Sequence, residues 1–133
     1  MRILCKIILP IELSAPNQML RTYWTVRYKQ QKDYILLLNA AIEDTHRAKP
    51  GEKRRLEIFS YRKKLLRDKD NLYFSVKILL DAMTKTRLLW DDSMKYTDYS
   101  IFQEVDRHNP RTEVIVYVLD EKKLNERRLN NEP

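Results

Sequence analysis

The chain has 133 residues, of which 34% are charged and 43% are hydrophobic, and its formal net charge is +7. This length suits one domain with one ordinary core, and the apolar content excludes a wholly disordered chain. Net charge of this sign favours nucleic acid or an anionic surface as the partner. No apolar run approaches the length of a membrane span, so we expect no membrane association.

Glycine and cysteine usage narrows the classes further. Gly51 is the single glycine, which excludes the glycine-rich phosphate loops of P-loop and dinucleotide-binding proteins. Cys5 is the single cysteine, so no internal disulfide can form, and we expect a reducing, cytoplasmic compartment. The opening MRILCKIILPIEL is interrupted by Lys6 and has no small-residue cleavage site, which predicts a buried strand rather than a signal peptide.

Hydrophobic spacing predicts six elements in the order β-α-β-α-β-β. In chain order they are a strand at 3–9, a helix at about 29–48, a strand at 54–62, a helix at 71–87, and strands at 95–104 and 112–119. A turn at Asn109 and Pro110 predicts that the last two strands form a closing hairpin. The fold class is therefore α+β, a small mixed sheet with two helices. We expect one domain over 1–119 and a polar tail over 120–133.

Two pairs of aspartates stand out in this basic chain. Asp68 and Asp70 lie in RDKDN, and Asp91 and Asp92 lie in LWDDS. Two carboxylates about 4 Å apart repel by roughly 4 kcal/mol at an effective dielectric of about 20. Clustered acids must therefore take up a proton, recruit a cation or stay apart. Carboxylates with water and phosphate oxygens suit Mg²⁺, which activates water for attack on a phosphodiester.

The local geometry favours a shared site. Asp68 and Asp70 are two apart in an extended segment, so both point to one face, and Asp70 is a candidate N-cap for the helix that begins at Asn71. Lys77 and Asp81 fall within roughly 20° of the Asp70 direction on a helical wheel. Lys77 would then contact a phosphate; the alternative is an ordinary ion pair with Asp81 on a solvated face.

The second aspartate pair, Asp91 and Asp92, lies at the start of the third predicted strand. Adjacent residues in a strand point to opposite faces, so only one of Asp91 and Asp92 can join Asp68 and Asp70. The alternative for all four is two unrelated polar turns, because aspartate is common in turns.

Basic residues crowd the approach to Asp68. The candidate DNA contacts are Arg54, Arg55, Arg62, Lys63, Lys64, Arg67 and Lys69. Such a run binds phosphates, although a solvated, charged strand edge is the alternative. A second candidate patch consists of Arg21, Arg27, Lys29 and Lys32 with Tyr23, Trp24 and Tyr28. Its aromatic residues would stack on unpaired bases, but we favour packing for Trp24. Phe74 falls on the polar side of the second predicted helix, where we favour packing in a dimer interface over insertion into DNA.

The string RDKDNLYFSVKILLDAM followed by LLWDDS, with SAPN at 14–17, resembles the RusA family of Holliday junction resolvases, a family common in phages and prophages. The resemblance covers about residues 3–119 and implies a Mg²⁺-dependent homodimeric endodeoxyribonuclease that cuts four-way, branched double-stranded DNA. Mn²⁺ is a plausible substitute. The chain departs from the family pattern between Asn71 and Lys77, where it is longer by about one helical turn.

The resemblance also implies roles for individual residues. Asp68, Asp70 and Asp92 would be the catalytic metal ligands and Lys77 an accessory base or phosphate contact, with Asp91 and Asn71 supporting them. Two alternatives remain. One is a basic nucleic-acid-binding module without catalysis, and the other is a nuclease of the same fold that acts on flaps or displacement loops.

Overall fold

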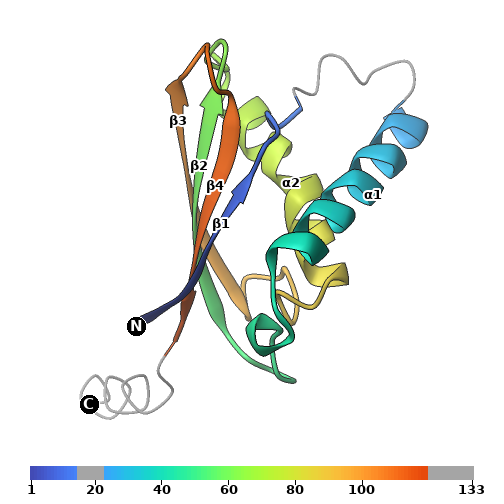
Figure 1. Ribbon diagram of the computed structural model, residues 1–133, viewed down its shortest axis with the longest axis vertical. Helices are drawn as coiled ribbons and strands as arrows, with labels where there is room; N and C mark the ends of the chain where they lie inside the picture. Colours follow the sequence, from blue (N-terminus) through green and yellow to red (C-terminus); the bar gives the residue numbers. More distant parts are fainter. Residues whose placement is uncertain (15–22, 120–133) are drawn as a thin grey trace.

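The computed structural model describes residues 1–14 and 23–119, with the backbone alone for 23–26 (Figure 1). The predicted α+β class and the order of the six main elements are confirmed. The elements are β1 (Arg2–Leu9), α1 (Tyr23–Ala41), the short 3-10 helix η2 (Asp44–His46), β2 (Arg54–Arg62), α2 (Lys69–Lys85), β3 (Thr97–Val105) and β4 (Arg111–Val118). Neither α-helix of the described residues has the length and apolarity to cross a membrane.

The four strands form one mixed sheet in the order β1-β4-β2-β3. β4 is antiparallel to both β1 and β2, whereas β2 and β3 are parallel. The predicted hairpin of the last two strands is therefore wrong. α2 is the crossover of a β-α-β unit, which places β3 at the edge of the sheet next to β2. The final strand, β4, therefore pairs between β1 and β2.

Both α-helices cover the same face of the sheet (Figure 1). The alternation along β2 is consistent with one covered face. Leu56, Ile58 and Ser60 are buried under the helices, whereas the residues between them are only partly buried. α2 contributes the largest buried stripe, which includes Val76, Leu79 and Met83, and α1 packs across it. The opposite face of the sheet carries the intervening side chains.

Both helices begin earlier in the chain than the sequence predicted. α1 ends at Ala41 rather than 48, since the Glu43 amide donates to Nδ1 of His46 at 3.0 Å and the backbone turns into η2. α2 begins at Lys69 because Asp68 caps it: Asp68 Oδ1 accepts from the Asp70 amide at 2.9 Å. The expected capping role of Asp70 is thus wrong, and Asp70 lies in the first helical turn.

Candidate functional site

Asp68 and Asp70 both lie at the N-terminal end of α2 and are exposed. The Asp68 carboxylate is engaged by the Asp70 amide. Negative charge at a helix N-terminus is favourable by about 0.3–1 kcal/mol at the surface. Capping by Asp68 and the favourable position of the Asp70 charge in the first turn thus give both aspartates a structural reason to be where they are.

Asp91 and Asp92 lie beyond the other end of α2, in the loop before β3. Asp91 is held within this loop: its carboxylate accepts from the Ser93 amide at 3.3 Å and from the Ser93 hydroxyl at 3.4 Å. Its backbone carbonyl accepts from the Thr97 hydroxyl. The short-range bonds of Asp91 therefore shape the turn that presents Asp92.

The carboxyl of Asp92 meets the carboxyls of Asp81 and Asp91. Partial burial, followed by hydrogen bonding to Asp81 and then to Asp91, raises the pKa of Asp92 above its ordinary value. Burial and neighbouring negative charge both disfavour the ionised form, so a cation bound beside this carboxyl would be favourable. Asp81 and Asp92 come from separate segments, the helix and the loop that follows it.

One guanidinium already faces this acidic cluster. Arg27 on α1 donates to Asp81 Oδ2 at 2.9 Å, and both side chains are mostly buried. Lys77, one turn before Asp81 on α2, is exposed. The expected alternative, a Lys77–Asp81 ion pair, is not formed, because the ion-pair partner of Asp81 is Arg27. Lys77 is thus an exposed lysine one helical turn before Asp81.

The structure does not bring Asp68 and Asp70 together with Asp92. Asp81 follows Asp70 by eleven residues of one helix, a rise of about 16 Å, and Asp92 lies at the Asp81 end. No three acidic, histidine or cysteine side chains of the described residues converge as a metal-binding group. The predicted ligand set of Asp68, Asp70 and Asp92 is thus not assembled in this structure, where Asp92 has Asp81 and Asp91 as its acidic neighbours.

Arg54 is a structural residue rather than a DNA contact. It is 2% exposed. Its guanidinium donates to the carbonyls of His46 and Leu88, the latter at 2.7 Å, and pairs with Glu52 at 2.8 Å. Since Leu88 lies in the loop that carries Asp91 and Asp92, Arg54 fastens that loop to the start of β2.

Arg62, at the other end of β2, is also buried, so it is a structural residue rather than the predicted DNA contact. It is 4% exposed, donates to the Leu13 carbonyl at 2.7 Å and lies 3.5 Å from Glu12. Desolvation lowers the pKa of this guanidinium. Simple alternation would have predicted both burials, because residues 54 and 62 have the same parity as the buried Leu56 and Ile58.

The other predicted DNA contacts divide into two groups. Arg55 lies on the face opposite the helices, where it pairs with Asp98 and donates to the Ser100 hydroxyl at 2.8 Å. The second group is exposed between β2 and α2 or in the first turn of α2, and we name it the basic loop: Lys63, Lys64, Arg67 and Lys69. No described residue forms an ion pair with any of these four side chains, so their charge is available to a polyanion.

The second candidate patch is only partly described. Arg21 lies outside the described residues, as do the side chains of Tyr23 and Trp24. Lys32 lies over the ring of Tyr28, with its ammonium 4.6 Å from the centroid. Phe74 is partly buried against the core, whereas we expected it on the polar side of α2, in a dimer interface. The sequence offered one further signal that we did not use: Arg27 in this patch is the residue that pairs with Asp81.

No family model and no curated protein sequence matches this chain. The resemblance to the RusA family thus depends on the motifs quoted above. The part of the motif that the structure keeps together is the C-terminal half, from Lys77 and Asp81 to Asp91 and Asp92.

Proposed function

We propose that this protein is a metal-dependent endodeoxyribonuclease that acts on branched DNA such as four-way junctions. The observation that carries the proposal is the meeting of the Asp81 and Asp92 carboxyls from two separate segments of a chain with a net charge of +7. The motif resemblance supports the same reading, because Lys77, Asp81, Asp91 and Asp92 keep its conventional spacing. Symmetric cutting of two strands would require two active sites and hence a homodimer.

The donor set at this cluster fits a hard divalent cation. Mg²⁺ is usually held by one or two carboxylates together with water and substrate phosphates, and Asp81 and Asp92 supply two carboxylates. When bound, Mg²⁺ or Mn²⁺ would polarise the phosphodiester and lower the pKa of a bound water. Partial burial and the neighbouring carboxyls raise the pKa of Asp92 because they disfavour its ionised form. A bound cation would offset the repulsion from these carboxyls and favour the ionised form.

Each neighbouring side chain has a part in this proposal. Arg27 fixes the orientation of Asp81 through their 2.9 Å ion pair. Arg54 fixes the loop that presents Asp92 through its bond to Leu88. Lys77, one turn before Asp81, places an exposed ammonium where it can bind a phosphate oxygen or stabilise developing negative charge.

The basic loop would seat the DNA backbone. It lies at the N-terminal end of α2, and Asp81 lies about 20 Å along the helix axis from Asp68. A nucleic acid that contacts both must run along α2, which suits a branched duplex better than a single nucleotide. Phosphate contacts of this kind make binding strongly salt-dependent.

Cleavage of a labelled synthetic four-way junction, with Mg²⁺ and then with EDTA, tests the proposal. We expect Mg²⁺-dependent nicking that Asp92→Asn abolishes while junction binding persists. The matched variant is Asp70→Asn, which we expect to retain most activity, because Asp70 lies far from the acidic cluster. Loss of cleavage in Asp70→Asn with full cleavage in Asp92→Asn would overturn this assignment of the centre. Competition with flaps, displacement loops and linear duplex identifies the preferred substrate.

The second candidate function is a basic nucleic-acid-binding module without catalysis. The observation that favours it is the separation of Asp68 and Asp70 from Asp92, with no three ligating side chains converging among the described residues. The same assay decides between the two functions. Junction binding that is independent of metal, with no nicking of any branched substrate in Mg²⁺ or Mn²⁺, would establish the module.

A further inference from the structure

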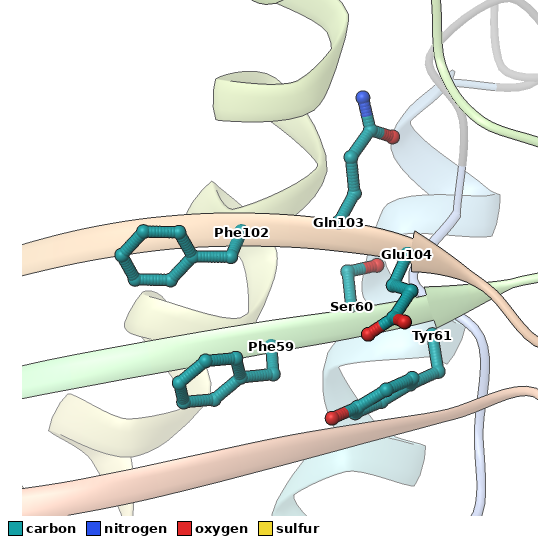
Figure 2. A pocket seen from close by; sticks show the side chains of 6 residues that line it. All are labelled: Phe59, Ser60, Tyr61, Phe102, Gln103 and Glu104. Carbon is teal, nitrogen blue, oxygen red and sulfur yellow. The ribbon is translucent and has the colours of Figure 1, made fainter.

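A small slot lies on the face of the sheet opposite the two helices, at the C-terminal ends of β2 and β3 (Figure 2). Its volume is about 180 Å³, and it is lined by Phe59, Ser60, Tyr61, Phe102, Gln103 and Glu104. Pockets for drug-sized ligands are roughly 300–1,000 Å³. The slot therefore has room for one small planar group rather than a whole metabolite.

The walls of the slot are built by two neighbouring cross-strand pairs, Phe59 with Phe102 and Tyr61 with Glu104. The two phenyl rings stack with centroids 5.3 Å apart and planes at 21°. Figure 2 shows this stacked pair on one flank and Tyr61 with Glu104 on the other. The aromatic surfaces are thus present before any ligand arrives.

The Tyr61 ring is itself held in place by a cation. The guanidinium carbon of Arg111 lies 3.9 Å from the ring centroid. Arg111 is in turn fixed by Asp106 at 2.8 Å and by Glu113 at 2.9 Å. These carboxylates raise the pKa of Arg111, so it stays charged. One face of Tyr61 therefore already carries a stacked guanidinium.

Glu104 supplies an unused negative charge at the slot. Its side chain is exposed, and no described residue forms an ion pair or hydrogen bond with it. The cations that the described strands place on this face are in ion pairs: Lys6 with Glu113, Arg55 with Asp98, and Arg111 with Asp106 and Glu113. Among the strand residues at the slot, the charge without a partner is therefore the Glu104 carboxylate, which favours a cationic group over a phosphate.

We propose that the slot binds the guanidinium of an arginine side chain from a partner protein. A guanidinium is planar and stacks on aromatic faces, so it fits between the phenyl pair and Tyr61. Its N–H groups would donate to the Glu104 carboxylate. β3 is one of the two edge strands of the sheet, so an extended segment of the partner can pair with β3 and bring its arginine to Glu104. This interaction is separate from the nuclease proposal.

The direct test uses the isotopically labelled full chain and three small probes in NMR titrations. The probes are the methylamide of Nα-acetylarginine, its neutral isostere with citrulline, and cytidine 5′-monophosphate. We expect the arginine probe to shift the amide signals of residues 59–61 and 102–104 saturably, while citrulline leaves them in place. Equal shifts with citrulline, larger shifts with the nucleotide, or no shift with any probe would each overturn the proposal.

Two variants add specificity to the test. Glu104→Gln keeps the shape of the slot, and we expect it to weaken arginine binding about tenfold. The matched control is Glu57→Gln on the same face, where the carboxylate already accepts a hydrogen bond from the Tyr117 hydroxyl, and we expect the affinity for arginine to change less than twofold. Phe102→Ala, on the exposed edge strand, should also weaken binding. Unchanged signals elsewhere confirm that each variant is folded, and unaltered binding by folded Glu104→Gln contradicts the proposal.

Discussion

The guanidinium of Arg54 donates a hydrogen bond to the backbone carbonyl of Leu88 at 2.7 Å. This contact joins the first residue of β2 to the loop after α2, three residues before Asp91. A second bond to the His46 carbonyl and the pair with Glu52 complete the surroundings of the guanidinium. The geometry of the acidic cluster therefore depends on a buried cation that touches none of its carboxyls.

Replacement of Arg54 with methionine tests this structural role. Arg54→Met leaves the two carbonyls and the Glu52 carboxylate without their donor, so we expect a loss of about 3–5 kcal/mol in the free energy of unfolding. Urea denaturation measures it. The adjacent Arg55→Met is the control: Arg55 forms a partly exposed pair with Asp98, and we expect a change of about 0–1 kcal/mol. A similar small effect for both variants would show that Arg54 does not fasten the loop.

The raised pKa of Asp92 predicts a particular pH dependence of stability. The folded state keeps the Asp92 proton above the ordinary value of 3.8, so it binds more protons than the unfolded chain between that value and the raised pKa. Stability therefore falls as pH rises through this interval. Asp92→Asn should be more stable than the wild type at pH 7, and the difference should vanish below about pH 3, where Asp92 is protonated in both states.

Asp106 provides a control of opposite sign for the same urea titration. The Arg111 guanidinium lowers the pKa of Asp106 from 3.8, so its contribution to stability is present above that value and is lost as pH falls through the folded-state pKa. Asp106→Asn should consequently be less stable than the wild type at neutral pH. If both variants shift stability in the same direction at pH 7, the electrostatic account of Asp92 is wrong.

The sequence predicted the elements well but placed their partners poorly. The alternation of Leu56 and Ile58 and the helical stripe that includes Val76 specify a sheet face and a helix face, and both are buried as expected. Strand pairing was predicted from the turn at Asn109, a local signal, whereas the order β1-β4-β2-β3 follows from the crossover through α2. Local sequence signals predict where a strand or helix lies, but tertiary packing determines which strand it pairs with.

The candidate site shows the same limit. Spacing predicted that Asp70, Lys77 and Asp81 share one side of the helix, but it could not show which end of the helix the later aspartates would meet. Asp68 and Asp70 begin α2 whereas Asp81 lies near its other end, about 16 Å from Asp70 along the helix axis. The sequence also did not show which cations are buried. Arg54 belongs to a basic run, but its guanidinium is buried and donates to the Leu88 carbonyl.

Addition of Mg²⁺ should stabilise the folded protein through the Asp81–Asp92 pair. Binding to the folded state alone raises the free energy of unfolding by about 2.7 kcal/mol at a concentration 100 times the Kd. We therefore expect the melting temperature to rise with Mg²⁺ in the wild type and in Asp70→Asn. The metal-induced rise should disappear in Asp81→Asn and Asp92→Asn, each compared with its own metal-free melting temperature. A rise that survives in Asp92→Asn but is lost in Asp70→Asn would place the cation at the other end of α2.

Charge removal in the basic loop should reduce the salt dependence of DNA binding. Each lost phosphate contact lowers the slope of log K against log salt by about 0.9 on duplex DNA. Lys63→Ala and Arg67→Ala should each weaken junction binding in low salt and reduce the slope by about that amount. Lys49→Ala, which removes an exposed lysine from the turn before β2, is the control and should leave the slope unchanged. Fluorescence anisotropy with a labelled junction at several salt concentrations measures the slopes, and identical slopes for all three variants would remove the basic loop from the DNA-binding surface.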